Sequence, residues 1–227
     1  MEHHLSVEGI DIYYREKGEG PVILFLHGWP TNSRLYDAQV AEFRSSHKVV
    51  TFDWPGFGLS DSPENHTYTF KHMLKVLTAL IKKVARDEQV TLVAHDIGGP
   101  PAILYAATYP DKVKRLVMLN TILYNMSTPL DKFSHTAFRV PLLNRLIMSD
   151  WYLKLLFRQL SKKTDSHFYK RVKTMLSHHQ NHHYRLRVKT ILEPLKHGQE
   201  ILTNMADKLA HLPVPKHLII AKSDPLC

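Results

Sequence analysis

An aspartate lies in the middle of a short pattern in which small residues flank a potential nucleophile. The segment Ala94–Gly98 reads Ala-His-Asp-Ile-Gly, and the apolar run Val90–Ala94 that leads into it predicts a strand. A helix is predicted directly afterwards, over Ile97–Thr108, and Pro110 stops it. A strand, a tight turn and a helix in this arrangement are typical of a nucleophile elbow. Such a turn would present Asp96 at the top of a sheet, where the helix N-terminus favours negative charge.

Taken alone, the pattern has a second interpretation, in which Asp96 only caps the helix. Two further motifs favour the catalytic interpretation. His27-Gly-Trp-Pro30 directly follows the apolar run Pro21–His27, a predicted strand, where an oxyanion-hole loop belongs. Asp53-Trp-Pro-Gly-Phe-Gly-Leu-Ser-Asp61 directly follows a further predicted strand, Lys48–Phe52.

These three motifs, in this order, resemble the α/β-hydrolases, and within them the epoxide hydrolases and haloalkane dehalogenases. The resemblance implies that Asp96 attacks an sp³ carbon of an epoxide or alkyl halide and becomes an alkyl ester. A carboxylate suits this attack because its reference pKa of about 3.9 leaves it ionised at neutral pH. The resemblance also implies an oxyanion hole made by the backbone N–H groups of Trp29 and Ile97, and Asp224 as the catalytic acid.

The same resemblance implies a catalytic histidine a few dozen residues after Asp224, beyond an eighth strand. The sequence ends at Cys227, and His217 opens the predicted seventh strand, Lys216–Ala221, too far below Asp224 to replace that histidine. We therefore expect a C-terminally truncated hydrolase that lacks its last strand and helix and turns over poorly. The alternative is a catalytically impaired or non-enzymatic family member that binds a small molecule or a partner.

The choice between halide and epoxide stays open. Dehalogenases commonly carry a halide-binding tryptophan where this chain has Ile97, and some carry an asparagine where it has Trp29, so a halide site is weakened. Epoxide hydrolases use lid tyrosines to protonate the opening oxygen. The candidate pocket residues are His27, Tyr124, Trp151 and Tyr152, with Tyr169 and Tyr184 as further lid tyrosines.

Strands and helices alternate through the first half of the chain, which predicts an α/β fold with a mostly parallel sheet flanked by helices. The stretch Phe70–Ala85 carries an apolar stripe at helical spacing. From about residue 123 the alternation gives way to helical stretches such as Phe138–Ile147, Trp151–Leu160 and Ile201–Leu209. We therefore expect an α/β-hydrolase core over 1–124 and 210–227, with an inserted helical cap over 125–209.

The formal charge of +9 is confined to one segment. Residues 131–217 hold 16 Lys and Arg against 6 Asp and Glu, a balance of +10, and the remainder holds 14 against 15, a balance of −1. A solvated helical surface explains this excess better than a nucleic-acid site, and we expect a small-molecule substrate as the partner. A basic interaction protein is the second rival to an enzyme.

Neither a cofactor nor a metal is expected. The run His178–His183 places histidines at i, i+4 spacing, but its basic, carboxylate-free surroundings favour a solvated helix face. The sequence has no secretory leader and no apolar run long enough to span a membrane, and its lone cysteine fits a reducing compartment. The cytoplasm is the expected location, and the oligomeric state stays open.

Overall fold

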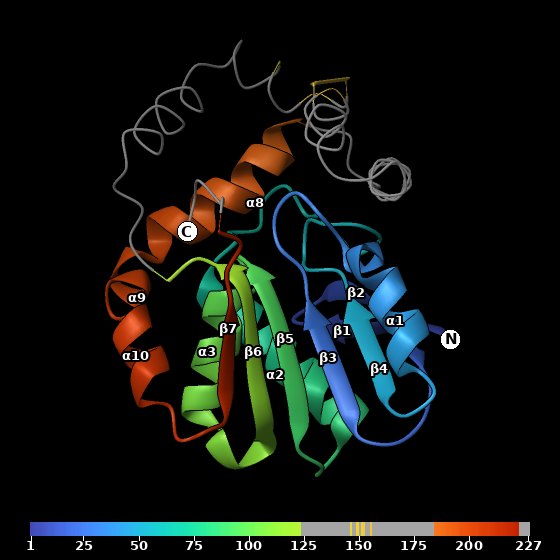
Figure 1. Ribbon diagram of the computed structural model, residues 1–227. Coiled ribbons are helices and arrows are strands. Elements are labelled where there is room, and N and C mark those ends of the chain that lie inside the picture. Colours follow the sequence, from blue (N-terminus) through green and yellow to red (C-terminus); the bar gives the residue numbers. More distant parts are fainter. Residues whose placement is uncertain (124–145, 147–148, 150, 153–154, 156–183, 223–227) are drawn as a thin grey trace.

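A mostly parallel seven-stranded sheet forms the centre of the molecule (Figure 1). The computed structural model describes residues 1–123, 146, 149, 151, 152, 155 and 184–222, with the backbone alone for 184–188. The strands are β1 (Glu2–Val7), β2 (Ile10–Lys17), β3 (Val22–Leu26), β4 (Lys48–Phe52), β5 (Val90–Asp96), β6 (Val113–Thr121) and β7 (Lys216–Ile219). Their order across the sheet is β1-β2-β4-β3-β5-β6-β7. The hairpin β1–β2 joins β4 in antiparallel fashion, and all the other pairings are parallel. The α/β-hydrolase arrangement predicted from the motifs is confirmed.

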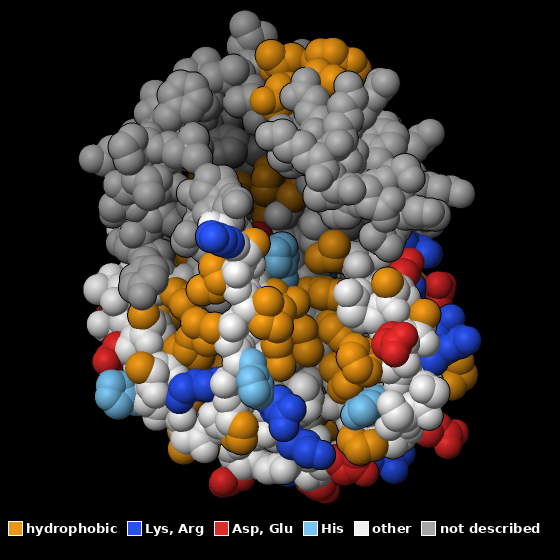
Figure 2. Space-filling model, in the orientation of Figure 1, with side chains coloured by type: hydrophobic (Ala, Val, Ile, Leu, Met, Phe, Trp, Pro, Cys, Tyr) orange, Lys and Arg blue, Asp and Glu red, His pale blue; other side chains and the backbone are white. Residues whose placement is uncertain are grey.

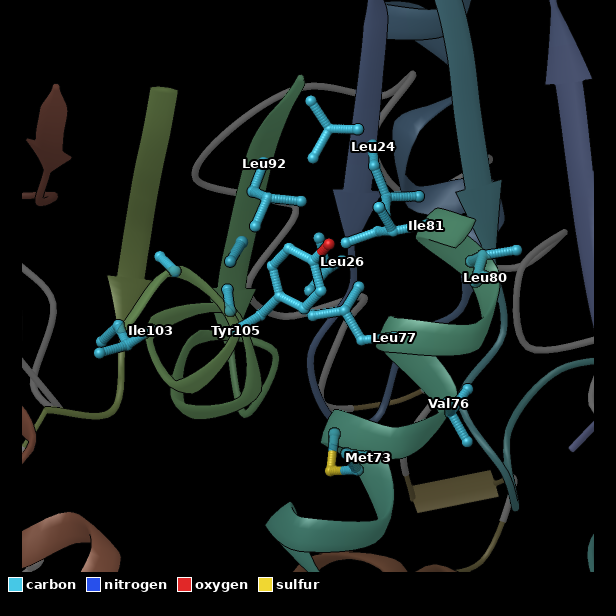
Figure 3. Packing of buried hydrophobic residues seen from close by; sticks show 14 of the residues in the cluster. Leu24, Leu26, Met73, Val76, Leu77, Leu80, Ile81, Leu92, Ile103 and Tyr105 are labelled. Atoms are coloured by element: carbon cyan, nitrogen blue, oxygen red, sulfur yellow. The ribbon is translucent and has the colours of Figure 1, made fainter. Parts of the chain in front are cut away.

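The helices lie on both faces of this sheet (Figure 1). They are α1 (Asp37–Phe43), α2 (Phe70–Ala85), α3 (Gly99–Thr108), α8 (Tyr184–His197), α9 (Gln199–Thr203) and α10 (Met205–His211), with 3-10 turns η1 (Ser33–Tyr36) and η2 (Pro110–Lys112). The stripe predicted on Phe70–Ala85 is confirmed, since Leu77, Leu80 and Ile81 of α2 are buried, and Leu77 and Ile81 point toward the strands β3 and β5 (Figure 3). There they pack with Leu24 and Leu92 in the main core.

The opposite face carries a smaller apolar cluster. Ile23, Phe25, Val49 and Val93 lie on it, and Tyr36 of η1 packs against them. Hydrophobic side chains gather over the middle of this face (Figure 2). Helix α1 covers the β4 side of the face (Figure 1).

The structure differs from the sequence-based expectations in several details, and β7 ends at Ile219 rather than Ala221. Helix α3 begins at Gly99 rather than Ile97, because Asp96 to Gly98 form the turn. The single helix predicted over Ile201–Leu209 is divided at Asn204 into α9 and α10. Strand β1 and helix α1 were not predicted.

The division into core and cap stays a prediction. Most of residues 125–183 lie outside the described part, including nearly all of the predicted helices Phe138–Ile147 and Trp151–Leu160. Among the described residues, Leu202, Met205 and Leu209 belong to the main core. The helices of the described part include none long and apolar enough to cross a membrane.

Strand β7 presents an apolar edge. In the described part of the chain it pairs with β6 alone, and Leu218, Ile219 and Ile220 are 47%, 57% and 54% exposed. An exposed apolar edge strand offers unpaired backbone groups to another chain. We therefore expect the 227-residue chain to self-associate through β7.

Replacing Ile219 by lysine is expected to suppress this association, because a charge on an edge strand opposes pairing with a second strand. Sedimentation velocity over a range of protein concentrations measures the effect. Gln199→Lys adds the same charge at an exposed position of α9 and serves as the control. Equal association of Ile219→Lys and Gln199→Lys would contradict the prediction.

Candidate functional site

Asp96 is the last residue of β5, at the carboxyl edge of the parallel strands. Its φ of 52° lies in the left-handed region, which Asp and Asn adopt more readily than most residues. The N–H of Gly98 donates to the carbonyl of His95 at 2.9 Å and closes the turn before α3. The register with β6 also shifts between His95 and Asp96, where the chain leaves the regular ladder. The structure therefore has the sharp strand-to-helix turn predicted around Asp96.

Three glycines leave the room that this turn requires. A Cβ on Gly98 would lie 2.8 Å from the carbonyl oxygen of His27, and one on Gly99 would lie 1.6 Å from Thr121 Oγ1. A Cβ on Gly28 would lie 2.4 Å from the Cβ of Asp96 itself. Larger residues at these positions would push the loop, the turn and the strand apart. The need for a small residue at position 98 was predictable from the motif, whereas the contact between Gly28 and Asp96 was not.

The loop that follows β3 touches the carboxylate directly. The backbone N–H of Trp29 donates to Asp96 Oδ2 at 2.7 Å. The loop is folded by Thr31, whose N–H and hydroxyl both donate to the carbonyl of Gly28. A fixed backbone donor thus lies against one oxygen of the candidate nucleophile. The second predicted donor, Ile97, is fully buried in the turn.

His27 supports this loop from inside the protein. It is fully buried, and its Nε2 accepts a hydrogen bond from the N–H of Trp54 at 3.1 Å. The proton therefore lies on Nδ1, which donates to the carbonyl of Gly28 at 2.9 Å. Burial lowers the pKa of His27 to about 3, so the ring is neutral at physiological pH. This neutral ring joins the ends of β3 and β4, and its predicted contact with substrate stays a prediction.

The last two residues of β6 lie on the other side of the turn. The hydroxyl of Thr121 donates to the carbonyl of Asp96 at 2.8 Å. Asn120, at a φ of 38°, accepts a hydrogen bond on its side-chain oxygen from the N–H of Ala221 at 3.0 Å. Asn120 thereby ties the carboxyl end of β6 to the segment that follows β7. The sequence motifs predict neither of these contacts of Asn120 and Thr121.

Helix α8 is anchored to the loop that follows β4. The carboxylate of Glu193 accepts a hydrogen bond from the N–H of Tyr68 at 2.7 Å. Thr190 is 2% exposed and lies so close to Gly56 that a Cβ there would be 2.5 Å from its methyl group. The positive φ of Gly56, 84°, gives a second reason for glycine at this position. The segment that begins at Asp53 therefore contacts and positions α8, a helix of the predicted cap.

Several predicted site residues lie outside the described part of the chain: Asp224, Tyr124, Tyr169 and the run His178–His183. For Tyr184 the backbone alone is described. Trp151 is 66% exposed and Tyr152 is half-buried. Their predicted roles stay predictions. Over the residues that are described, His, Cys, Asp and Glu side chains form no group of three that could hold a metal ion.

Named proteins resemble between about half and two thirds of the chain. A cis-3-alkyl-4-alkyloxetan-2-one decarboxylase of Shewanella oneidensis is 39% identical over 121 residues, which cover 52% of this chain and 38% of that protein. Epoxide hydrolase 3 of Xenopus tropicalis is 32% identical over 153 residues, with 62% of this chain and 41% of that protein covered. Haloalkane dehalogenase 2 of Mycobacterium tuberculosis is 32% identical over 127 residues, with 56% and 43% covered. Each match spans less than half of the relative's own length.

The fold has solved counterparts, and a family model matches most of the chain. The crystal structure of haloalkane dehalogenase DbeA from Bradyrhizobium elkani superposes with a TM-score of 0.76 at 23% identity. That match covers 97% of this chain and 80% of the dehalogenase, and at this identity it shows the fold alone. A family model described as alpha/beta hydrolase fold matches residues 21–223. The chain belongs to the α/β-hydrolase fold family.

Proposed function

We propose that this chain is a hydrolase-type enzyme whose Asp96 carboxylate attacks an electrophilic sp³ carbon and forms an alkyl ester. The observation that carries the proposal is the 2.7 Å hydrogen bond between the Trp29 N–H and Asp96 Oδ2. It couples a carboxylate on a left-handed turn to a fixed backbone donor. A carboxylate that only capped α3 would need neither the loop of Trp29 nor a glycine at position 28 pressed against it.

The chemistry follows from which bonds form and break. An oxygen of Asp96 donates an electron pair to the carbon, and the bond from that carbon to halide or epoxide oxygen breaks. A halide leaves as the anion, whereas an epoxide oxygen stays on the product and takes up a proton. Oδ2 then becomes the carbonyl oxygen of the ester, with the Trp29 N–H already against it. If water later attacks the ester carbon, the same N–H would stabilise the oxyanion, with the Ile97 N–H as the proposed second donor.

Hydrolysis of the ester needs a base, and two histidines of the described part that lie close to Asp96, His27 and His95, are poorly suited to that role. His27 uses both ring nitrogens inside the protein and has a pKa of about 3. His95 precedes Asp96 in β5, and neighbouring residues of a strand point to opposite faces. We therefore propose that the ester persists on this 227-residue chain, with Asp224 as the acid that would orient a base.

Three classes of electrophile are consistent with this chemistry. Terminal epoxides and primary alkyl bromides follow from the relatives named as an epoxide hydrolase and a haloalkane dehalogenase. A β-lactone is the third class, because the relative that is 39% identical is named for an oxetan-2-one, a strained ring with an sp³ carbon–oxygen bond. A small molecule of one of these classes is the proposed substrate, and no nucleic-acid partner is proposed.

Intact-protein mass spectrometry after incubation with each electrophile tests the proposal. An epoxide or lactone is expected to add its whole mass once, whereas a bromide adds only its alkyl group, and peptide mapping should place the adduct on Asp96. The experiment is run on Cys227→Ser, because the cysteine thiol is a competing nucleophile. Absence of an adduct on Asp96 with every class would contradict the enzyme and favour a non-catalytic binding protein. Repeated turnover would contradict only the proposal that the ester persists, and not the proposal that Asp96 is the nucleophile.

A further inference from the structure

A cavity of about 420 Å³ lies between α1 and the strands β2 and β4, and its lining contains none of the residues around Asp96. Its lining includes four side chains that carry positive charge: Arg15, Lys17, Arg34 and Arg44. The acids of the lining are Glu2, Glu16 and Asp37. The apolar part of its wall consists of Val40, Ala41 and Val49.

Most of the acidic charge in this cavity is already neutralised. Asp37 accepts a hydrogen bond from Arg15 at 2.8 Å, and Glu16 forms an ion pair with Lys48 at 3.0 Å. In the described part of the chain, Lys17, Arg34 and Arg44 have no such carboxylate partner, which leaves Glu2 as the acid against three cations. The cavity therefore has an excess of positive charge.

Two donors of the cavity lining are buried and unused. Thr51 is 1% exposed and its hydroxyl has no hydrogen-bond partner. The Nε–H of Arg15 is also buried and without a partner, although the side chain as a whole is 16% exposed. Arg15 and Thr51 face each other across the antiparallel pair β2–β4, so both side chains lie on the face that α1 covers. Buried donors without a partner are rare in native proteins, and an unfilled site for an acceptor is one explanation.

We propose that this cavity binds a small organic phosphate. A phosphate dianion matches the excess of cations, and its several acceptor oxygens suit guanidinium groups and a threonine hydroxyl. The apolar wall formed by Val40, Ala41 and Val49 would contact the organic part of such a ligand. The site involves none of the residues around Asp96, so it stands whether or not Asp96 is alkylated.

Isothermal titration calorimetry with phenyl phosphate at fixed ionic strength tests the proposal. One molecule is expected to bind to the whole chain, and binding should persist in Asp96→Asn. Removing two cations in Arg34→Gln/Arg44→Gln should weaken binding by about tenfold or more, because hydrogen bonds to charged groups are lost. Lys82→Gln/Lys83→Gln removes two charges from α2, on the opposite face of the sheet, and should bind as the unmodified chain does.

Thr51→Val separates a binding role from a structural one. Valine keeps the shape and removes the unpartnered hydroxyl, so the melting temperature of the free protein should rise, while phenyl phosphate should bind several-fold more weakly. Absence of binding at millimolar phenyl phosphate would overturn the proposal. If Lys82→Gln/Lys83→Gln weakened the binding of phenyl phosphate as much as Arg34→Gln/Arg44→Gln, binding would reflect the overall charge of the protein and the proposed site would be wrong. Equally tight binding of benzoate would overturn the assignment to phosphate.

Discussion

Asp96→Asn is expected to abolish alkylation by epoxides, bromides and β-lactones while leaving the fold intact. A neutral amide lacks the electron-rich oxygen that attacks carbon, so the rate of adduct formation should fall by on the order of a thousandfold or more. Asparagine adopts the left-handed backbone at position 96 as readily as aspartate does, and its carbonyl can still accept the Trp29 N–H. The adduct yield by mass spectrometry and the unfolding midpoint in urea are measured together.

Asp96→Ala separates the two roles of this residue. It also removes the nucleophile, but it leaves the Trp29 N–H without its acceptor and puts a residue without polar atoms at a φ of 52°. The left-handed conformation costs about 1–2 kcal/mol for such residues, and the loss of a partly buried hydrogen bond costs about 0.5–1.5 kcal/mol. Asp96→Ala should therefore be less stable than Asp96→Asn. An unchanged rate of labelling in Asp96→Asn would show that another residue is the nucleophile.

The parts of the fold that were predictable from the sequence are those with a strong local pattern. The bounds of α2 match the predicted helix over Phe70–Ala85, since its stripe, its N-cap Thr69 and its interior all favour a helix. Strand β4 also matches its predicted bounds, because all its residues except Lys48 are buried and Val49, Val50 and Phe52 are apolar. In both cases, local preference and tertiary packing favour the same structure.

The elements that were missed have weak local patterns. Strand β1 carries Glu2, His3 and His4 and is mostly exposed, and tertiary pairing with β2 fixes it. Helix α1 has no buried residue, so it has no apolar stripe to detect. The break at Asn204 between α9 and α10 interrupts an apolar pattern that continues on both sides.

From the sequence, the candidate site was predictable as two local motifs but not as a set of contacts between distant residues. A strand–turn–helix pattern identifies Asp96, and the motif of His27 to Pro30 identifies its neighbouring loop. The contact of Gly28 with Asp96 and the hydrogen bond from Thr121 to the carbonyl of Asp96 join residues far apart in the sequence. Sequence spacing carries no signal for such contacts, so the supporting residues came from the structure alone.

Asp53 is such a supporting residue, and Asp53→Ala is expected to destabilise the protein by about 3–5 kcal/mol. Its carboxylate is 1% exposed and accepts hydrogen bonds from the N–H of Ser33 at 2.7 Å and of Leu59 at 2.8 Å. Removing it takes the acceptor from the buried N–H of Ser33 and from the partly buried N–H of Leu59, and it disconnects the segments that follow β3 and β4. Asp53→Asn should also destabilise, because its NH₂ group would oppose one of these donors.

Asp61→Ala provides the matched control, since Asp61 belongs to the same motif. Its carboxylate accepts one hydrogen bond, from the N–H of Asp11 at 3.0 Å, at an exposed position, so its loss should cost about 1 kcal/mol or less. Urea denaturation of both variants gives the comparison. Similar free energies of unfolding for Asp53→Ala and Asp61→Ala would show that the buried carboxylate does not hold these loops.

A large difference would mean that the loop bearing Trp29 depends on Asp53 for its position, since Ser33 lies four residues after Trp29 on the same segment. Labelling of Asp96 in Asp53→Ala should then be slower even at temperatures where that variant is folded.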